Sequence, residues 1–188
     1  MVFAGVMYVV MAYIGEGLPK NDVFYRPFEV ITPEGTMVNP VPDAPVAGGW
    51  EVCMRSCELA TKALSAALPE QAIAATKGII CNVAYGGSDP RGDDEYVYYE
   101  TFGGGYGGRH SLDGLDGVQS HLQDTANSPI EELETEAPLY VRNYEFRQDS
   151  EGAGRSRGGL GIRRDMEFYD HEASFSLLTD RTKSAPWG

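Results

Sequence analysis

Residues 96–127 read YVYYETFGGGYGGRHSLDGLDGVQSHLQDTAN, and the rest of the chain is organised around this stretch. An aromatic run typical of a β-strand leads into Gly103–Gly108, where five of six residues are glycine. Glycine loses more backbone entropy on folding than any other residue, so such a dense run indicates positive φ angles or a close approach of the backbone. We interpret the loop as part of a binding or catalytic surface, with elaborate tight turns as the alternative.

A polar segment follows this glycine loop. His110 and His121 flank a doubled Asp-Gly at Asp113 and Asp116. Carboxylates and imidazoles are ordinary ligands of divalent metals, but Asp-Gly is also a common turn sequence. Metal binding, structural turns and hydrogen bonding to a substrate therefore remain open for these residues.

The glycine loop also satisfies the pattern G-x-G-x-x-G after an expected strand. In a dinucleotide-binding fold the third glycine opens a helix whose N-terminus faces the pyrophosphate. Residues 109–114, RHSLDG, begin no helix, so the pattern disfavours a Rossmann fold.

A second glycine loop, residues 152–161 (GAGRSRGGLG), carries Arg155 and Arg157. Guanidinium groups and backbone N–H groups both suit a phosphate or a carboxylate ligand. The alternative is local ion pairing, for which Asp149 and Glu151 are available.

The composition is acidic, with 28 acids and 15 bases in 188 residues and a formal net charge of −13. Nucleic acids and anionic membranes attract basic proteins, so neither is expected as the main partner. The three cysteines have no CxxC spacing, and reduced thiols fit a cytoplasmic protein. One domain is expected at this length.

Residues 1–14, MVFAGVMYVVMAYI, are almost all apolar but too few to span a bilayer. Without a basic leading region they do not resemble a signal peptide, so we expect a helix or strand that packs into a core. The uncapped beginning and the abrupt end at Trp187-Gly188 lead us to expect an incomplete domain of a larger subunit.

The clearest periodicity lies in residues 49–67, where Cys53, Cys57 and Leu64 belong to one helical stripe. Pro69 ends this helix and is expected to open a short helical turn through Ala75. A short acidic helix is expected up to Glu136, with Ser128 as its N-cap. Strands are expected at residues 23–31, 79–85, 95–102, 139–146, 162–169 and 173–179, a turn at 33–36 and a loop at 86–90.

These elements predict an α+β fold. One main helix is expected to pack on mostly antiparallel strands, and the C-terminal part is expected to form a β-meander.

Short motifs in a fixed order then suggest a family. They are Pro33-Glu34-Gly35-Thr36, Asn39-Pro40, Ala44-Pro45-Val46, Gly86-Gly87 with Asp89-Pro90, Tyr99-Glu100 before GGGYGG, Asp113-Gly114, Asp116-Gly117, Asn127, Pro129-Ile130-Glu131 with Glu134, and Asp149-Ser150 before GAGRSRGGLG. In this order the sequence resembles the hydantoinase B family, which includes N-methylhydantoinase B subunits, the C-terminal part of 5-oxoprolinase and acetone carboxylase-type subunits. The resemblance covers most of residues 17–188, with residues 1–16 as an apolar lead-in.

The resemblance implies a cytoplasmic component of an ATP-dependent hydrolase that opens a hydantoin or 5-oxoproline ring. A partner of the hydantoinase A type would bind ATP and phosphorylate the carbonyl oxygen of the cyclic amide, and the B part would activate water. The alternatives are a carboxylase-type subunit and a non-catalytic assembly module. A hetero-oligomer without nucleic acid or membrane partners is expected.

The resemblance also implies a divalent metal in the full family enzyme, held by histidine and aspartate ligands in an N-terminal part outside this chain, so we expect no metal ligand among these residues. We expect catalytic roles for Asp113, Asp116 and His121. The expected substrate contacts are Gly104, Gly105, Arg109, His110, Asn127, Arg155 and Arg157. These residues are chosen for their position around the glycine loops and are not carried over from the family.

Overall fold

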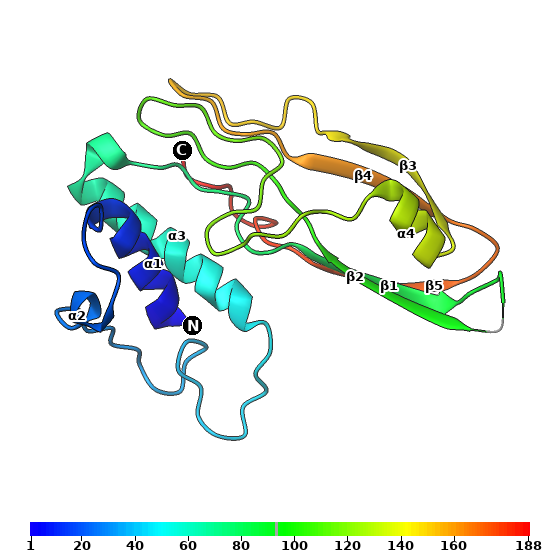
Figure 1. Cartoon of the computed structure of the whole chain (residues 1–188), viewed down its shortest axis with the longest axis horizontal. Helices are drawn as coiled ribbons and strands as arrows, with labels where there is room; N and C mark the ends of the chain where they lie inside the picture. Colours follow the sequence, from blue (N-terminus) through cyan, green and yellow to red (C-terminus); the bar gives the residue numbers. More distant parts are fainter. Residues whose placement is uncertain (93) are drawn as a thin grey trace.

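Two long helices lie side by side at one end of the molecule, and two small antiparallel sheets extend from them (Figure 1). The computed structural model describes residues 1–92 and 94–188. Its elements are α1 (Val2–Ile14), α2 (Asp22–Tyr25), α3 (Gly49–Ala67), the 3₁₀ turn η1 (Pro69–Gln71), β1 (Asn82–Ser88), β2 (Glu95–Thr101), α4 (Ile130–Glu136), β3 (Leu139–Phe146), β4 (Ile162–Phe168) and β5 (Ala173–Leu178). The predicted α+β class is confirmed.

The apolar opening is helix α1, and it packs against α3. Gly5 makes this close approach possible, since a Cβ there would lie 2.6 Å from the carbonyl oxygen of Cys53. The Cys57 thiol donates to the carbonyl of Gly5 at 3.4 Å. The main helix was expected to pack on strands, but its stripe of small residues faces another helix, and α4 covers the sheets instead.

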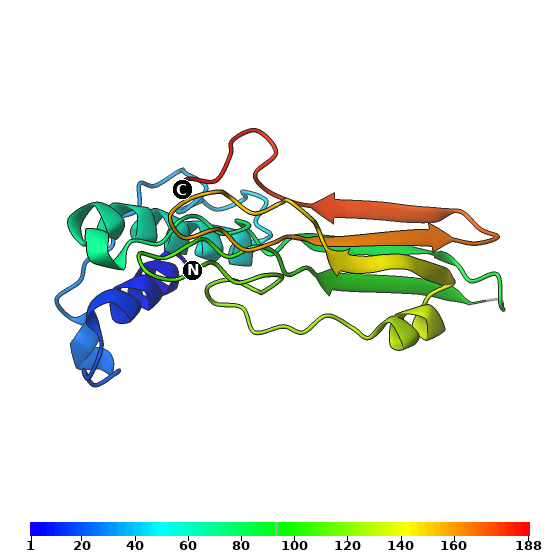
Figure 2. The same ribbon diagram turned by 90° about the horizontal axis from the view of Figure 1, so that it is seen from above.

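The strands form a three-stranded sheet in the order β2-β1-β5 and a two-stranded sheet of β3 and β4, all antiparallel. Both sheets run away from the helices along the same direction (Figure 2). Alternate side chains of β1 and β2 join residues of α4, β3 and β4 in one core cluster. Its buried members are Val83, Tyr85, Tyr96, Tyr98, Leu133, Ala137 and Leu139.

The expected β-meander is wrong in its last strand, because β5 pairs with β1 and not with β4. The chain changes sheets at Asp170, whose φ is +57°. Gly87 then allows the crossing chain to come close, since a Cβ on it would lie 2.6 Å from the carbonyl oxygen of Glu172.

Gly86 and Gly87 were expected in a loop, yet both belong to β1. A Cβ on Gly86 would lie 2.6 Å from the carbonyl oxygen of Tyr96 on the neighbouring strand. The two glycines therefore permit tight strand pairing, and β1 begins and ends three residues later than predicted.

Three local predictions also differ from the structure. Residues 23–31 form no strand, because Asn21 caps the short helix α2 by accepting from the Val23 N–H at 3.1 Å. Pro69 opens only the 3₁₀ turn η1, not a helix through Ala75. Ser128 does not cap α4, because the helix begins at Ile130 with Pro129 as its N-cap, and the Ser128 hydroxyl accepts from Tyr98 at 2.9 Å. The helix at 49–67 and the strands that begin at residues 95, 139, 162 and 173 are confirmed.

Candidate functional site

The two glycine loops lie against each other, backbone on backbone. Tyr106 donates its N–H to Leu115 and accepts from the N–H of Gly159, both at 2.9 Å. A Cβ on Gly105 would lie 2.1 Å from the Gly159 carbonyl oxygen, and one on Gly159 would lie 1.9 Å from that of Leu115. Most of this glycine content is therefore explained by chain packing within the protein.

Asp113, Asp116 and Arg157 join the same two loops. Arg157 donates to both carboxylate oxygens of Asp116, at 2.9 and 3.1 Å, and its backbone N–H donates to Asp113 at 2.8 Å. Asp116 also accepts from the N–H of Leu160 at 2.7 Å. The hydrogen bonds from Arg157 lower the pKa of the Asp116 carboxyl. This geometry gives both carboxylates a structural contact. Arg155, in the second glycine loop, is exposed.

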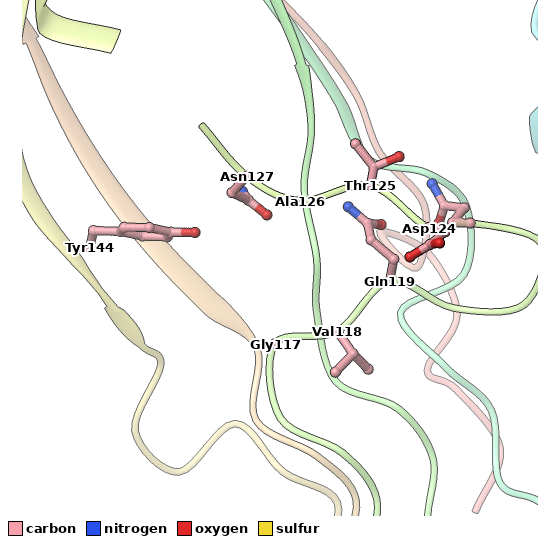
Figure 3. A pocket seen from close by; sticks show the side chains of 9 residues that line it. Gly117, Val118, Gln119, Asp124, Thr125, Ala126, Asn127 and Tyr144 are labelled. Atoms are coloured by element: carbon pink, nitrogen blue, oxygen red, sulfur yellow. The ribbon is translucent and has the colours of Figure 1, made fainter. Parts of the chain in front are cut away.

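A pocket of about 440 Å³ opens beside these loops (Figure 3). Gly117, Val118, Gln119, Gln123, Asp124, Thr125, Ala126, Asn127 and Tyr144 line it. The Tyr144 hydroxyl and the amides of Asn127 and Gln119 point toward the same space (Figure 3). Among the described residues, the buried Asn127 Nδ2 and Gln123 Oε1 have no hydrogen-bond partner. Because unpaired buried polar groups are costly, these two atoms are suited to a polar ligand.

A lysine lies behind one wall of the pocket. Lys77 Nζ donates to Gln119 Oε1 at 2.7 Å, to the Ile80 carbonyl at 3.0 Å and to the carbonyl of Phe102. Burial lowers the pKa of Lys77 to about 8. The ammonium thus connects the pocket to the strand end before the first glycine loop, where Gly104 packs on the lysine side chain.

The opposite wall is held by a buried ion pair. Arg164 lies over the ring of Tyr144, 4.4 Å from its centroid, and over that of Phe102 at 4.5 Å. Its guanidinium pairs with Glu100, and the two side chains are 2% and 5% exposed. The buried Arg164–Glu100 pair thereby supports one face of the Tyr144 ring.

The remaining predicted residues lie outside this pocket. His121 lies between the rings of Tyr8 and Tyr106, with centroid distances of 6.4 and 5.9 Å and a φ of +55°. Burial lowers its pKa. Arg109 and His110 line a separate cavity of about 250 Å³, where His110 contacts Glu70 at 2.8 Å.

The structure therefore separates most of the predicted residues, and it brings only Asn127 of them to the larger pocket. Gly104 and Gly105 contribute backbone near Lys77: the carbonyl of Gly105 accepts from the Lys77 N–H at 3.0 Å. The catalytic and substrate-binding roles assigned from sequence remain predictions.

Sequence reasoning missed Lys77, Gln119, Gln123 and Tyr144. The stretch from Gln119 to Asn127, QSHLQDTAN, offered a signal, because it is rich in amides and hydroxyls without helical or strand periodicity. Lys77 stands two residues before the buried pair Ile79-Ile80, an unusual place for a basic side chain.

The described residues contain no group of three or more His, Cys, Asp or Glu side chains that could hold a metal ion. The divalent metal implied by the family resemblance thus has no fitting ligand set in this part of the chain. Within the same residues, no helix combines the length and apolar character needed to cross a membrane.

The fold and the pocket define an α+β protein with a small site of side-chain amides, two hydroxyls and a carboxylate, suited to a compact polar ligand. The family model described as hydantoinase B/oxoprolinase matches residues 1–188. The chain therefore belongs to the hydantoinase B/oxoprolinase family.

Relatives in three groups of organisms support this membership. An uncharacterized protein of Methanocaldococcus jannaschii is 41% identical over 98% of this chain and 32% of its own length. A Pseudomonas protein named provisionally as the B component of a D-/L-hydantoinase is 35% identical over 90% of this chain and 28% of its own length. 5-Oxoprolinase 1 of Arabidopsis thaliana is 30% identical over 98% of this chain and 14% of its own length. The chain thus spans about a third or less of the length of these relatives.

Proposed function

We propose that this chain is a component of a cyclic-amide hydrolase and that the pocket at Asn127 binds the ring. The family match over residues 1–188 carries the proposal. The names of two relatives, one a hydantoinase component and the other a 5-oxoprolinase, supply the substrate class.

The unpaired groups of the pocket support this ligand class. A cyclic amide presents one carbonyl oxygen and one N–H group on the same edge of the ring. Asn127 Nδ2 and Gln123 Oε1 have no partner among the described residues and are buried in the pocket wall, so each side chain would turn into the pocket to donate to the ring oxygen or accept from the ring N–H. A small cyclic amide would pair both buried groups and would displace water from the pocket.

Ring opening needs more than binding, because resonance makes the amide carbonyl a poor electrophile and negative charge develops on its oxygen. In the proposed enzyme, a partner of the hydantoinase A type would bind ATP and transfer its terminal phosphoryl group to that oxygen, releasing ADP, and phosphate would leave when water opens the ring. The Pseudomonas relative is named as one subunit of its enzyme, which supports such a partner. The role proposed for this chain's residues is to bind and orient the ring, and no step is assigned to a metal. A cytoplasmic, hetero-oligomeric enzyme is part of the same proposal.

The test combines binding and turnover. We expect hydantoin or 5-oxoproline to bind the chain by calorimetry, and the chain with a hydantoinase A-type partner and ATP to open the ring without bicarbonate. Asn127→Ala should lower kcat/KM about tenfold, the effect of one lost hydrogen bond of roughly 1.4 kcal/mol. Asn143→Ala, an exposed amide on β3, is the matched control and should change nothing.

Three results would count against the proposal. Absence of both binding and ring opening would remove it, and a strict requirement for bicarbonate would favour the carboxylase-type alternative. Turnover unchanged by Asn127→Ala would favour a non-catalytic assembly role for this region.

A further inference from the structure

Lys77 is a half-buried cation that contacts the wall of the proposed ligand pocket through Gln119, and its position is unusual. Its ammonium contacts three oxygen acceptors, the Gln119 side chain at 2.7 Å and the carbonyls of Ile80 and Phe102. None of these acceptors is a carboxylate. The three N–H donors of the ammonium are therefore used on neutral oxygens, which fixes its orientation.

This contact determines which end of the Gln119 amide faces the pocket. An ammonium can only donate hydrogen bonds, so the oxygen of Gln119 must turn toward Lys77. The amide nitrogen is left on the other side, and it reaches only Thr101, at 3.4 and 3.5 Å. These distances are long for hydrogen bonds, so the nitrogen keeps donor capacity for a ligand.

In Figure 3 the nitrogen end of Gln119 lies on the side of Asn127. Both amides line the pocket, and the Asn127 nitrogen has no partner among the described residues. The pocket therefore presents the side-chain nitrogen of Gln119, while the Asn127 nitrogen is buried in the wall. A ligand with a carbonyl oxygen that accepts from the Gln119 nitrogen is favoured over one that presents only donors there.

We propose that Lys77 is a positioning residue that locks the amide of Gln119, so that the pocket offers N–H donors to a carbonyl oxygen of its ligand. The identity of that ligand rests on the proposed function, but the locking of Gln119 does not. Nothing in the family match or in the names of the relatives assigns a role to this lysine.

The proposal has a pH signature, because a neutral amine has a lone pair that can accept from a flipped amide. Burial lowers the pKa of Lys77 to about 8, and the nearby Cys81 thiol acts in the opposite direction. The other groups that contact the ammonium are carbonyl oxygens, which do not titrate. The hydrogen bond from Lys77 to the Gln119 oxygen should therefore weaken as the pH rises through about 8.

The experiment follows the side-chain amide signals of Gln119 by NMR in the ¹⁵N-labelled chain from pH 6.5 to 9.5, without and with hydantoin. In the natural chain we expect these signals to shift with a midpoint near pH 8 and hydantoin to bind about three- to tenfold more weakly at the high end, as for loss of a charge-assisted hydrogen bond. The Gln123 amide, which does not contact Lys77, is the internal control.

Two variants separate positioning from simple support of the fold. Lys77→Arg keeps its charge over the whole range, so Gln119 should show no midpoint and binding should stay constant. Lys77→Met should bind hydantoin about tenfold more weakly at every pH, because the oxygen of Gln119 is no longer held. If neither variant folds, the comparison of Gln119 with Gln123 in the natural chain decides.

The proposal is overturned if the Gln119 signals do not change with pH, or if Lys77→Met folds and binds hydantoin as the natural chain does. If hydantoin does not bind at all while Gln119 still titrates in the natural chain, the proposed ligand is wrong and the positioning role of Lys77 stands.

Discussion

Glu100 and Arg164 show at the residue scale how the two sheets are held together. Their side chains are 5% and 2% exposed, and Glu100 also accepts from the N–H of Ser128 at 2.9 Å. Removing one partner of a buried pair leaves an uncompensated charge. We therefore expect Arg164→Met to lower the free energy of unfolding by about 3–5 kcal/mol, measured by urea denaturation.

The matched control is the ion pair between Arg142 and Glu167, which joins strands β3 and β4 on the surface. Their side chains are 54% and 56% exposed, so solvent screens the interaction. Arg142→Met should leave the urea midpoint almost unchanged. Equal losses for the two variants would show that burial of the Glu100 pair is not the deciding factor.

His121 should make stability depend on pH. Burial lowers its pKa, so the folded protein holds it neutral while the unfolded chain binds a proton as the pH falls through about 6.5. The unfolded state then carries more protons, and stability is lost on acidification from that value toward the folded pKa.

The comparison uses His121→Asn, because asparagine tolerates the φ of +55° at this position. Between pH 7.5 and 5.5 the natural chain should lose more unfolding free energy than the variant, as measured by urea denaturation at both values. An equal loss would mean that His121 is not protonated preferentially in the unfolded chain.

At the scale of elements, the paired glycine loops should not tolerate side chains at their contacts. A Cβ on Gly159 would lie 1.9 Å from the Leu115 carbonyl oxygen, whereas one on Gly161 would meet only the Ser150 hydroxyl at 3.6 Å. Gly159→Ala should therefore cost about 1–3 kcal/mol or more of stability, the usual range for overpacking. Gly161→Ala, in the same loop, should cost much less in the same denaturation assay.

Local patterns predicted some of these elements well. The helical stripe of residues 49–67 and the alternation of residues 139–146 gave the bounds that the structure has, because hydrophobic periodicity is read within one segment. The partner of β5 and the place of Gly86 and Gly87 depend on strands far away in the sequence. No local pattern contains that information.

The candidate site was less predictable for the same reason. Asn127 was expected from its place after the glycine loop, and the structure puts it in the pocket. Lys77 and Tyr144 reach the same region from separate segments, and only the packing of the loops brings them together. The glycine loops predicted a site in the part of the chain where the pocket lies, although most of these glycines serve the contact between the two loops.

At the scale of the whole molecule, Glu58 joins parts that are distant in sequence. Its side chain is 1% exposed and accepts from the N–H and the hydroxyl of Thr76, at 2.9 and 2.8 Å. It also pairs with Arg55 on the same helix and with Arg181 after β5. The helical end and the C-terminal segment thus share one buried carboxylate.

This arrangement predicts that Glu58→Gln loosens the C-terminal segment. Trp187 reports on it, since its indole donates to the Ile73 carbonyl at 3.4 Å and its ring lies 5.4 Å from the Arg181 guanidinium. In a Trp50→Phe background, which leaves Trp187 as the single tryptophan, Glu58→Gln should shift the native emission to the red.

The same variant should lower the free energy of unfolding by about 3–5 kcal/mol, because two arginines lose their buried partner. Leu59→Ser, on the same helix but 64% exposed, is the control and should change neither quantity. Lower stability with unchanged Trp187 emission would mean that Glu58 holds α3 to the segment at Thr76 without fixing the C-terminal segment.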